Sequence, residues 1–396
     1  MSVGSPSPAS SNVRIGLVGF GGMGSKHAGY IHNGEVPGAT LAAVCDVRPE
    51  RLAKAREQFG DRVRVFEHVD AMLDAGGVDA VFVATPHYDH PPLATRALER
   101  GLHVLVEKPA GVYTKQVRAM NEAARRSGRV FGVMYNQRTI PAHRRMRQLV
   151  QGGELGEVRR VLYQITDWLR TQSYYDSGGW RGTWSGEGGG VLMNQSPHNL
   201  DLWQWICGMP ARVRAFCRFG QYHNVEIEDD VTAYAEYPNG ATGVFITTTG
   251  EAPGTKQLEV TGDRGRAVLS GNTITFWRTA VPVPEYIRTD PRPMTMPPTE
   301  KIEITPDGVA EDHEGITRDW VRAIRTGSPL LAPGEEGIAA VELANAMLLS
   351  TWTDNWVNVP IDDDLYEREL RRRAEQSTFR KPEQRAGAAL DFSGTF

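Results

Sequence analysis

The chain has 396 residues, of which 40% are hydrophobic and 23% charged, and its formal net charge is −4 at pH 7. This length and composition indicate a globular protein of about two domains, without the basic excess of a nucleic-acid-binding protein. Cys45, Cys207 and Cys217 show neither disulfide nor metal-ligand spacing, so we expect no metal site and a reducing compartment.

No apolar run approaches the ~18 residues that a membrane span needs. The Ser/Pro-rich segment 1–12 lacks the basic and apolar parts of a signal peptide, and we expect it to be a disordered tail. The expected location is therefore the cytoplasm, with no membrane partner.

A glycine-rich turn follows the first apolar strand, Val13–Val18, and a helix is expected to begin near Ser25. Between a strand and a helix, G-x-G-x-x-G is the context of a dinucleotide-binding turn; the alternative is a turn without a ligand. Such a turn uses its glycines for tight turning, close approach of a pyrophosphate and helix–strand packing. The residues expected to bind NAD here are Gly19, Phe20, Gly21, Gly22, Met23 and Gly24.

A second strand, 41–46, ends at Asp46, which lies 22 positions after Gly24. An acid at about this distance binds the adenosine ribose hydroxyls and repels a 2′-phosphate, which favours NAD. Arg48 could pair with that phosphate and leaves NADP open. Asp46 could instead cap the helix that begins at Pro49.

Strands and helices then alternate. We expect strands at 63–66, 78–84, His103–Val106 and 130–134, and helices at 90–100 and Thr114–Ser127. This alternation predicts a doubly wound parallel sheet, a Rossmann α/β domain over 13–137. Thr85, Pro86 and Lys108 would then lie at the carboxyl ends of strands, where such sheets bind ligands. The alternative for Lys108 is a solvated lysine just past a strand.

The second domain, 138–367, is expected to be α+β. After a helix ending at Val150, alternating segments predict strands at 157–168, 211–219, 231–237, 241–249, 257–261 and 267–270. Helices are expected near 314–326 and 335–355. This pattern indicates a large, mostly antiparallel open sheet. The proline-rich stretch 281–298 is expected to be an extended excursion, and 368–396 a C-terminal tail or arm.

Several motifs together resemble one family. Thr85-Pro86, His90, Ala97-Leu98, Gly101 and Glu107-Lys108-Pro109 are similar to the Gfo/Idh/MocA oxidoreductases, the family of glucose–fructose oxidoreductase and inositol dehydrogenase. The resemblance extends from about residue 13 to about residue 360. It implies that Thr85, Pro86, His90, Glu107 and Lys108 contribute to NAD binding. It also implies a homodimer or homotetramer that pairs through the open face of the second sheet.

A second motif includes Gly188-Gly189-Gly190, Asn194, His198 and Asp201. The resembled family has an acid four positions before its histidine, and Asn194 stands where that acid usually lies. The resemblance implies a catalytic set of Lys108, His198 and residue 194, whose amide could hold a sugar hydroxyl or orient the imidazole.

Histidine is the side chain best suited to accept an alcohol proton at neutral pH. Ser196-Pro197 predicts a helix start that places His198 in the first turn, where the helix dipole disfavours imidazolium. One alternative is a longer helix from Gly190, kinked at Pro197. Another is a buried, hydrogen-bonded histidine.

The predicted function is an NAD-dependent oxidoreductase that transfers a hydride between nicotinamide and a secondary hydroxyl of a pyranose sugar, glycoside or cyclic polyol. One alternative is a glycosidase-type enzyme that oxidises its sugar transiently, and another is a non-enzymatic cofactor-sensing regulator. Trp203 and Trp205 favour core packing, whereas Trp180 lies in a glycine-rich loop suited to a pocket. The expected substrate contacts are Lys108, Asn136, Arg138, Trp180, Arg181, Asn194 and His198.

Overall fold

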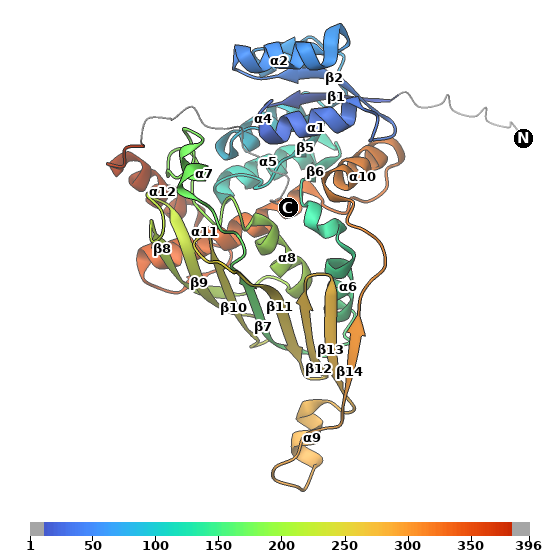
Figure 1. Ribbon diagram of the computed structural model, residues 1–396, viewed down its shortest axis with the longest axis vertical. Helices are drawn as coiled ribbons and strands as arrows, with labels where there is room; N and C mark the ends of the chain where they lie inside the picture. The colour runs from blue at the N-terminus through green and yellow to red at the C-terminus, as the bar shows by residue number, and fades with distance from the viewer. Residues whose placement is uncertain (1–11, 382–396) are drawn as a thin grey trace, which may run out of the picture.

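The structure is a computed structural model that describes residues 12–381, so the expected tail at 1–12 lies outside it except for Asn12, as do residues 382–396. Two sheets organise the chain (Figure 1). The strands of the first lie within residues 13–137, and those of the second within 138–367.

The first sheet has six parallel strands in the order β3-β2-β1-β4-β5-β6. They are β1 Val13–Val18, β2 Ala39–Cys45, β3 Arg64–Phe66, β4 Ala80–Val83, β5 His103–Val106 and β6 Phe131–Val133. Every residue of β4 is buried, as expected for a strand with helices on both faces. The strand order reverses between β1 and β4, which is where doubly wound sheets bind their ligands. The predicted Rossmann fold is confirmed.

The helices of this part begin with α1, which starts three residues earlier than Ser25 and so contains Gly24. Its N-cap is Gly21, so the glycine turn is shorter than expected. The helices are α1 Gly22–His32, α2 Pro49–Phe59, α3 Val69–Asp74, α4 His90–Glu99 and α5 Thr114–Ser127, with short 3-10 turns η1 Gly60–Arg62 and η2 His87–Asp89.

The second sheet has nine strands in the order β14-β13-β12-β11-β7-β10-β9-β8-β15. All neighbours are antiparallel except β7 and β10. The strands are β7 Val158–Ile165, β8 Arg212–Phe219, β9 Glu228–Glu236, β10 Thr242–Thr248, β11 Lys256–Gly262, β12 Gly265–Ser270, β13 Thr273–Thr279, β14 Thr299–Ile304 and β15 Val357–Asn358. The mostly antiparallel sheet is confirmed.

One face of this sheet is covered by helices, including α6 Pro141–Gln151, α8 Pro197–Cys207 and α11 Gly337–Thr353 (Figure 1). The other face is open. Along β9, Val231, Ala233 and Ala235 are buried while Thr232 and Tyr234 are exposed, which is the alternation of a strand with one solvated face.

Three features differ from the expectations. Strands β13 and β14 were not predicted, although Ile274 and Phe276 of β13 alternate as strand residues do. The stretch 281–298, expected to be extended, contains α9 Val283–Thr289, a helix whose first turn carries a proline that favours helix initiation. The expected tail at 368–396 begins inside α12 Asp363–Gln376, where buried Leu370 packs against the core.

The remaining elements complete the second part of the chain. They are η3 Asn136–Thr139, α7 Gln172–Asp176, α10 Asp312–Thr326 and η4 Gly334–Glu336. Helix α10 lies against α1, β1 and β5 of the first sheet, so this later segment returns to the Rossmann part (Figure 1). Within residues 12–381, none of the helices is both long enough and apolar enough to cross a membrane.

Candidate active site

The glycine turn between β1 and α1 forms a cradle of backbone. Gly19 has φ +95°, and a Cβ there would lie 2.6 Å from the carbonyl oxygen of Ala84. A Cβ on Gly24 would collide with the carbonyl oxygen of Gly19. At Gly21 the nearest protein atom to a Cβ is a guanidinium nitrogen of Arg51, 3.7 Å away, so this position is open. The free N–H groups of the first turn of α1 suit a phosphate.

Asp46 is buried next to this turn. Its Oδ2 accepts hydrogen bonds from the Phe20 N–H at 2.7 Å and from Arg51 Nη1 at 3.0 Å, and its Oδ1 accepts from the Arg48 N–H at 2.9 Å. The N-cap of α2 is Arg48, so Asp46 does not cap that helix. The Arg48 side chain is exposed and lies 4.0 Å from Glu50.

Arg51 was not identified from the sequence. Its guanidinium pairs with Asp46 and borders Gly21, so it lies beside the expected ribose site. The one available signal was its place in the first turn of α2, on a helix that starts beside the expected ribose-binding acid.

The loops after β4 and β5 are joined by His90. Its Nδ1 lies 2.7 Å from the carbonyl oxygen of Pro109, and its Nε2 lies 2.7 Å from that of Thr85. His90 therefore acts through the backbone of the two loops. Thr85 Oγ1, by contrast, is buried without a hydrogen-bond partner in the described chain, which leaves it available to a ligand.

Lys108 is half-buried and reaches across to the second motif. Its Nζ donates a hydrogen bond to the carbonyl oxygen of Asn194 at 3.0 Å. It is therefore not a freely solvated lysine. Burial lowers the pKa of the Lys108 ammonium, and the neighbouring Glu107 carboxylate opposes that shift.

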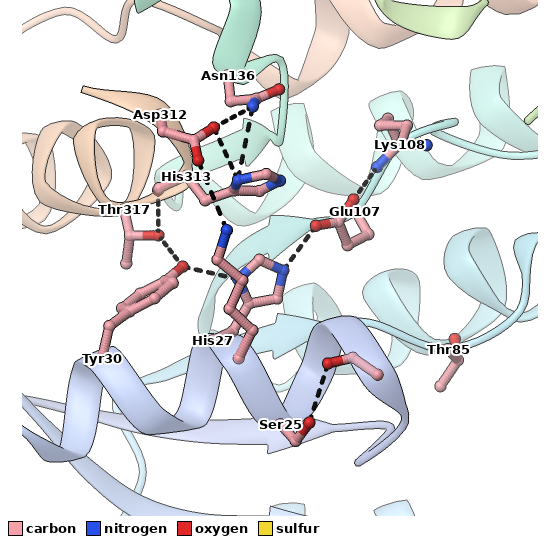
Figure 2. A network of polar contacts seen from close by, with 12 residues as sticks. Ser25, His27, Tyr30, Thr85, Glu107, Lys108, Asn136, Asp312, His313 and Thr317 are labelled. Atoms are coloured by element: carbon pink, nitrogen blue, oxygen red, sulfur yellow. Dashed lines mark hydrogen bonds and ion pairs between the residues drawn. The ribbon is translucent and has the colours of Figure 1, made fainter. Parts of the chain in front are cut away.

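Glu107 faces away from Lys108 Nζ, into a buried network (Figure 2). Its Oε1 lies 2.6 Å from His27 Nε2, and its Oε2 accepts the Lys108 N–H at 3.0 Å. Burial alone would raise the pKa of Glu107, but the hydrogen bond from His27 and the neighbouring positive charges, Lys108 among them, together outweigh it and lower the pKa to about 2. Glu107 is thus an ionised support for the backbone of Lys108.

The network continues into α10. His27 Nδ1 lies 2.8 Å from the hydroxyl of Tyr30, which lies 2.7 Å from that of Thr317 (Figure 2). Asn136 Nδ2 donates to Asp312, while Asn136 Oδ1 is buried without a partner in the described chain. The amide of Asn136 therefore keeps one acceptor for a ligand.

His198 lies in the first turn of α8, which starts at Pro197 with Ser196 as its N-cap, as predicted. The longer helix from Gly190 is not formed, because residues 191–195 are turns. His198 is 2% exposed, and neither ring nitrogen has a hydrogen-bond partner in residues 12–381. Burial, helped by the Lys108 charge, holds the pKa of His198 well below 6.5, so the ring is neutral and able to accept a proton.

The triple-glycine loop before this motif is held by Glu228, which no pattern in the sequence singled out. Its Oε1 accepts the N–H groups of Gly190 at 2.7 Å and Leu192 at 3.1 Å. A Cβ on Gly190 would overlap the carbonyl oxygen of Glu228. Burial raises the pKa of Glu228 to about 8. This contact fixes the loop that presents Asn194.

Asn194 lies in a polar cluster with Glu187 and Tyr174. Its Nδ2 donates to Glu187 Oε1 and, at 3.1 Å, to the Tyr174 hydroxyl. Arg181 Nη1 donates to the same hydroxyl at 2.7 Å, and the Arg181 guanidinium lies 4.4 Å from the centre of the Trp180 ring. Glu187 and Tyr174 were not identified from the sequence.

Arg138 is held inside the protein, which argues against its predicted role as a substrate contact. The side chain is 0% exposed. Its Nε and Nη2 donate to Asp201 at 2.8 and 2.5 Å, and its Nη1 donates to Glu336 at 2.5 Å. All three nitrogens are thus engaged inside the protein.

The tryptophans near the motif divide as expected. Trp203 is fully buried and stacks on Phe245, with 5.2 Å between ring centres, and Trp205 packs between Arg138 and Arg147. Trp180 is half-exposed and lies against the ring of His87.

This arrangement defines the class of protein. A backbone cradle with an acid beside it, at the switch point of a parallel sheet, fits a dinucleotide. Thr85 Oγ1 and the His198 ring nitrogens are buried acceptors or donors without partners among the described residues, as expected where a cofactor and a substrate belong. Nor do residues 12–381 contain a cluster of His, Cys, Asp or Glu suited to a metal ion. The fold and site are those of an NAD-binding oxidoreductase.

Comparison with known proteins gives the family. Residues 13–135 match the oxidoreductase family with an NAD-binding Rossmann fold, and residues 143–268 match the GFO/IDH/MocA C-terminal domain. The chain belongs to the Gfo/Idh/MocA family, and the resemblance stated from the sequence is confirmed.

Relatives align over most of the chain. D-glucoside 3-dehydrogenase of Escherichia coli (strain K12) is 26% identical over 88% of this chain and 98% of its own length. Inositol 2-dehydrogenase of Rhizobium meliloti (strain 1021) is 26% identical over 85% and 96%. The WlbA dehydrogenase from Bordetella pertussis, solved with NADH and UDP-GlcNAcA, superposes with a TM-score of 0.75 at 26% identity, covering 89% of this chain and 100% of that one.

Proposed function

We propose that the protein oxidises a secondary hydroxyl of a sugar, glycoside or cyclic polyol with NAD. The observation that carries this proposal is the contact of Lys108 with the 194–198 segment. A half-buried ammonium is bonded to the backbone of Asn194, and a neutral imidazole without a partner in the described chain lies four residues further on. The names of the relatives, a glucoside dehydrogenase and an inositol dehydrogenase, support the substrate class.

The cofactor would be held by the 19–24 turn, Asp46, Arg51 and Thr85. Asp46 would accept from the ribose hydroxyls, and the N-terminus of α1 would receive the pyrophosphate. When bound, NAD supplies the hydride acceptor of the reaction.

Lys108 would donate a hydrogen bond to the oxygen of the reacting hydroxyl. Its burial strengthens this interaction, because water screens a charge less in a water-poor site. Negative charge that develops on the oxygen as its proton leaves is stabilised by the ammonium.

His198 would accept the hydroxyl proton at a free ring nitrogen. Its low pKa keeps the ring neutral at physiological pH. Asn136 Oδ1, Trp180 and Arg181 would contact the rest of the sugar. Arg181 is oriented by the Tyr174 hydroxyl, and Trp180 offers an aromatic face to the apolar C–H surface of a sugar ring.

The test is a panel of neutral sugars, polyols and glycosides assayed for NADH formation, with Lys108→Ala as the control. Turnover of at least one compound by the wild type and its loss in the variant would support the proposal. Cleavage of a glycoside without NADH accumulation would point instead to transient oxidation. Cofactor binding without any turnover would point to a regulator.

We also propose that two or more copies pair through the open face of the second sheet. Phe216 is 60% exposed, and Tyr234 and Trp356 are more than a third exposed, although all three are large and apolar. They come from or adjoin neighbouring strands β8, β9 and β15, so they form a continuous surface. Light scattering on the wild type should report a dimer or tetramer, and Phe216→Glu should shift it toward the monomer. A monomeric wild type would contradict the proposal.

A further inference from the structure

Glu187 is a buried carboxylate to which the proposed chemistry has given no role. It is 0% exposed, and burial raises the pKa of its carboxyl group. Its Oε2 accepts the N–H of Gly182 at 2.7 Å, and its Oε1 accepts from Asn194 Nδ2. Burial of a carboxyl group is costly unless it is hydrogen-bonded, and one of the two hydrogen bonds that Glu187 accepts comes from the side chain at position 194.

The contacts fix which way the amide of Asn194 faces. In its ionised form, which the Arg181 charge favours, the Glu187 carboxylate can only accept hydrogen bonds, and the amide turns its nitrogen toward it. The second hydrogen of Nδ2 is directed to the Tyr174 hydroxyl at 3.1 Å. Asn194 Oδ1 therefore points away from Glu187, and it accepts no hydrogen bond from the described residues.

Asn194 is at the same time bound to Lys108. The backbone carbonyl oxygen of Asn194 accepts from Lys108 Nζ at 3.0 Å, and His198 follows four residues later in the first turn of α8. The residue that carries the free Oδ1 therefore contacts Lys108 through its backbone and lies four positions before His198. An acceptor at this place recognises a hydroxyl, which can donate, and rejects a carbonyl or carboxylate oxygen, which cannot.

We propose that Glu187 is a positioning residue that orients the Asn194 amide so that Oδ1 accepts a hydrogen bond from a second hydroxyl of the substrate. Glu187 and Asn194 together then present this acceptor, with the carboxylate at position 187 and the contact atom at position 194. The inference rests on the proposed function, and it deepens that function by requiring a substrate with a hydroxyl next to the one oxidised.

Exchange of the two side chains tests the proposal. In Glu187→Gln, the new amide cannot accept from both the Gly182 N–H and Asn194, so two donors face each other unless the Asn194 amide rotates and turns its NH₂ toward the substrate. We expect kcat/KM to fall by roughly tenfold or more, mainly through KM, because a buried hydrogen bond is replaced by a donor–donor contact. Asn194→Asp should also lose activity, since two carboxylates would then be in contact.

The double variant Glu187→Gln/Asn194→Asp should recover most of the loss. The amide introduced at position 187 can accept from the Gly182 N–H and donate to the carboxylate introduced at position 194. One oxygen of that carboxylate then remains as the acceptor toward the substrate. We expect kcat/KM of the double variant to return to within about threefold of the wild type, a difference at the low end of the net contribution of one hydrogen bond. A merely structural role for Glu187 would give additive losses and no recovery.

Glu226→Gln is the matched control. The Glu226 carboxylate also accepts a backbone N–H, that of Trp184 at 2.8 Å, but within residues 12–381 no hydrogen bond joins it to Asn194. It should leave KM near the wild-type value and should not rescue Asn194→Asp. Thermal unfolding and NAD titration of every variant separate folding defects from positioning.

Two results would overturn the proposal: wild-type kcat/KM in Glu187→Gln, or a double variant no better than Asn194→Asp alone. Failure of the proposed function looks different, because the wild type would then turn over none of the sugars. In that case the free energies of unfolding of the wild type, the two single variants and the double variant are compared instead. Coupling between positions 187 and 194 would retain the pair as a structural unit, and additive effects would reject the contact itself.

Discussion

His198 and Asp201 stand three residues apart at the start of α8, and both are almost fully buried, yet their surroundings are opposite. Asp201 is closed off by two hydrogen bonds from Arg138, whose remaining donor group is held by Glu336. His198 has no hydrogen-bond partner in the described chain on either nitrogen. Buried polar groups are almost always paired, so the unpaired one is the one reserved for a ligand. The Arg138–Asp201 pair is thus closed within the fold, whereas the ring nitrogens of His198 are left open for the proposed reaction.

Disruption of the Arg138–Asp201 ion pair should have the largest effect on stability. Arg138→Met leaves Asp201 buried without its cation, and we expect the free energy of unfolding to fall by about 3–5 kcal/mol. Urea denaturation measures the loss. Arg138→Met/Asp201→Leu should recover much of it, because no buried unpaired charge then remains; Glu336, which also loses Arg138, is 45% exposed. Equal stability of Arg138→Met and the wild type would show that the ion pair does not hold this region.

Replacement of His198 should leave folding intact. His198→Asn removes the proposed proton acceptor, and we expect kcat/KM to fall by roughly a hundredfold or more, within the range for removal of a general base. The melting temperature should stay the same or rise, because a buried imidazole without a partner in the described chain contributes no hydrogen bond to the fold. Activity near the wild-type level would show that another group is the base.

The pH profile sharpens the same contrast. In the proposed reaction His198 must be neutral, and its pKa lies well below 6.5, so the acid limb of kcat/KM should fall below that pH. Lys108 works when charged, and burial lowers its pKa from 10.5, so activity should decline on the alkaline side before pH 10.5. Each limb changes the rate about tenfold per pH unit. Retention of the acid limb in His198→Asn would contradict the assignment.

Cofactor preference is the smallest effect expected. NAD should bind more tightly than NADP, because Asp46 occupies the side where a 2′-phosphate would lie. Asp46→Ser should improve NADP relative to NAD by about tenfold, since it removes a charge and frees Arg51 for the phosphate. Adding Arg51→Ala should cancel that gain. Titration with both cofactors decides it, and a wild type that prefers NADP would contradict this interpretation of Asp46.

The parts that were predicted from the sequence are those with local signals. Strand–helix alternation, the glycine turn and Ser196-Pro197 each specify their own backbone, and the parallel sheet and the start of α8 followed from them. The position of Lys108 past a buried strand also placed it at the ligand side of that sheet. In these cases a short segment determines its own conformation, and the order of such segments along the chain indicates how they pack into layers.

The parts that were missed depend on contacts between distant segments. Glu187 meets Asn194 only because the triple-glycine loop folds back, and that loop is held by Glu228 from β9. Arg138 was expected in the pocket because it follows the last Rossmann strand, but the direction of its side chain is set by Asp201, sixty-three residues later. No pattern in one segment reports such pairings.

The network behind Glu107 has a mechanical consequence. Helix α1 starts at the cofactor cradle, and its His27 and Tyr30 are bonded on one side to Glu107, next to Lys108, and on the other to Thr317 of α10 (Figure 2). A tilt of α1 would have to break this chain of short hydrogen bonds in a buried place where water cannot replace them. We therefore expect the cradle and the lysine to move as one unit.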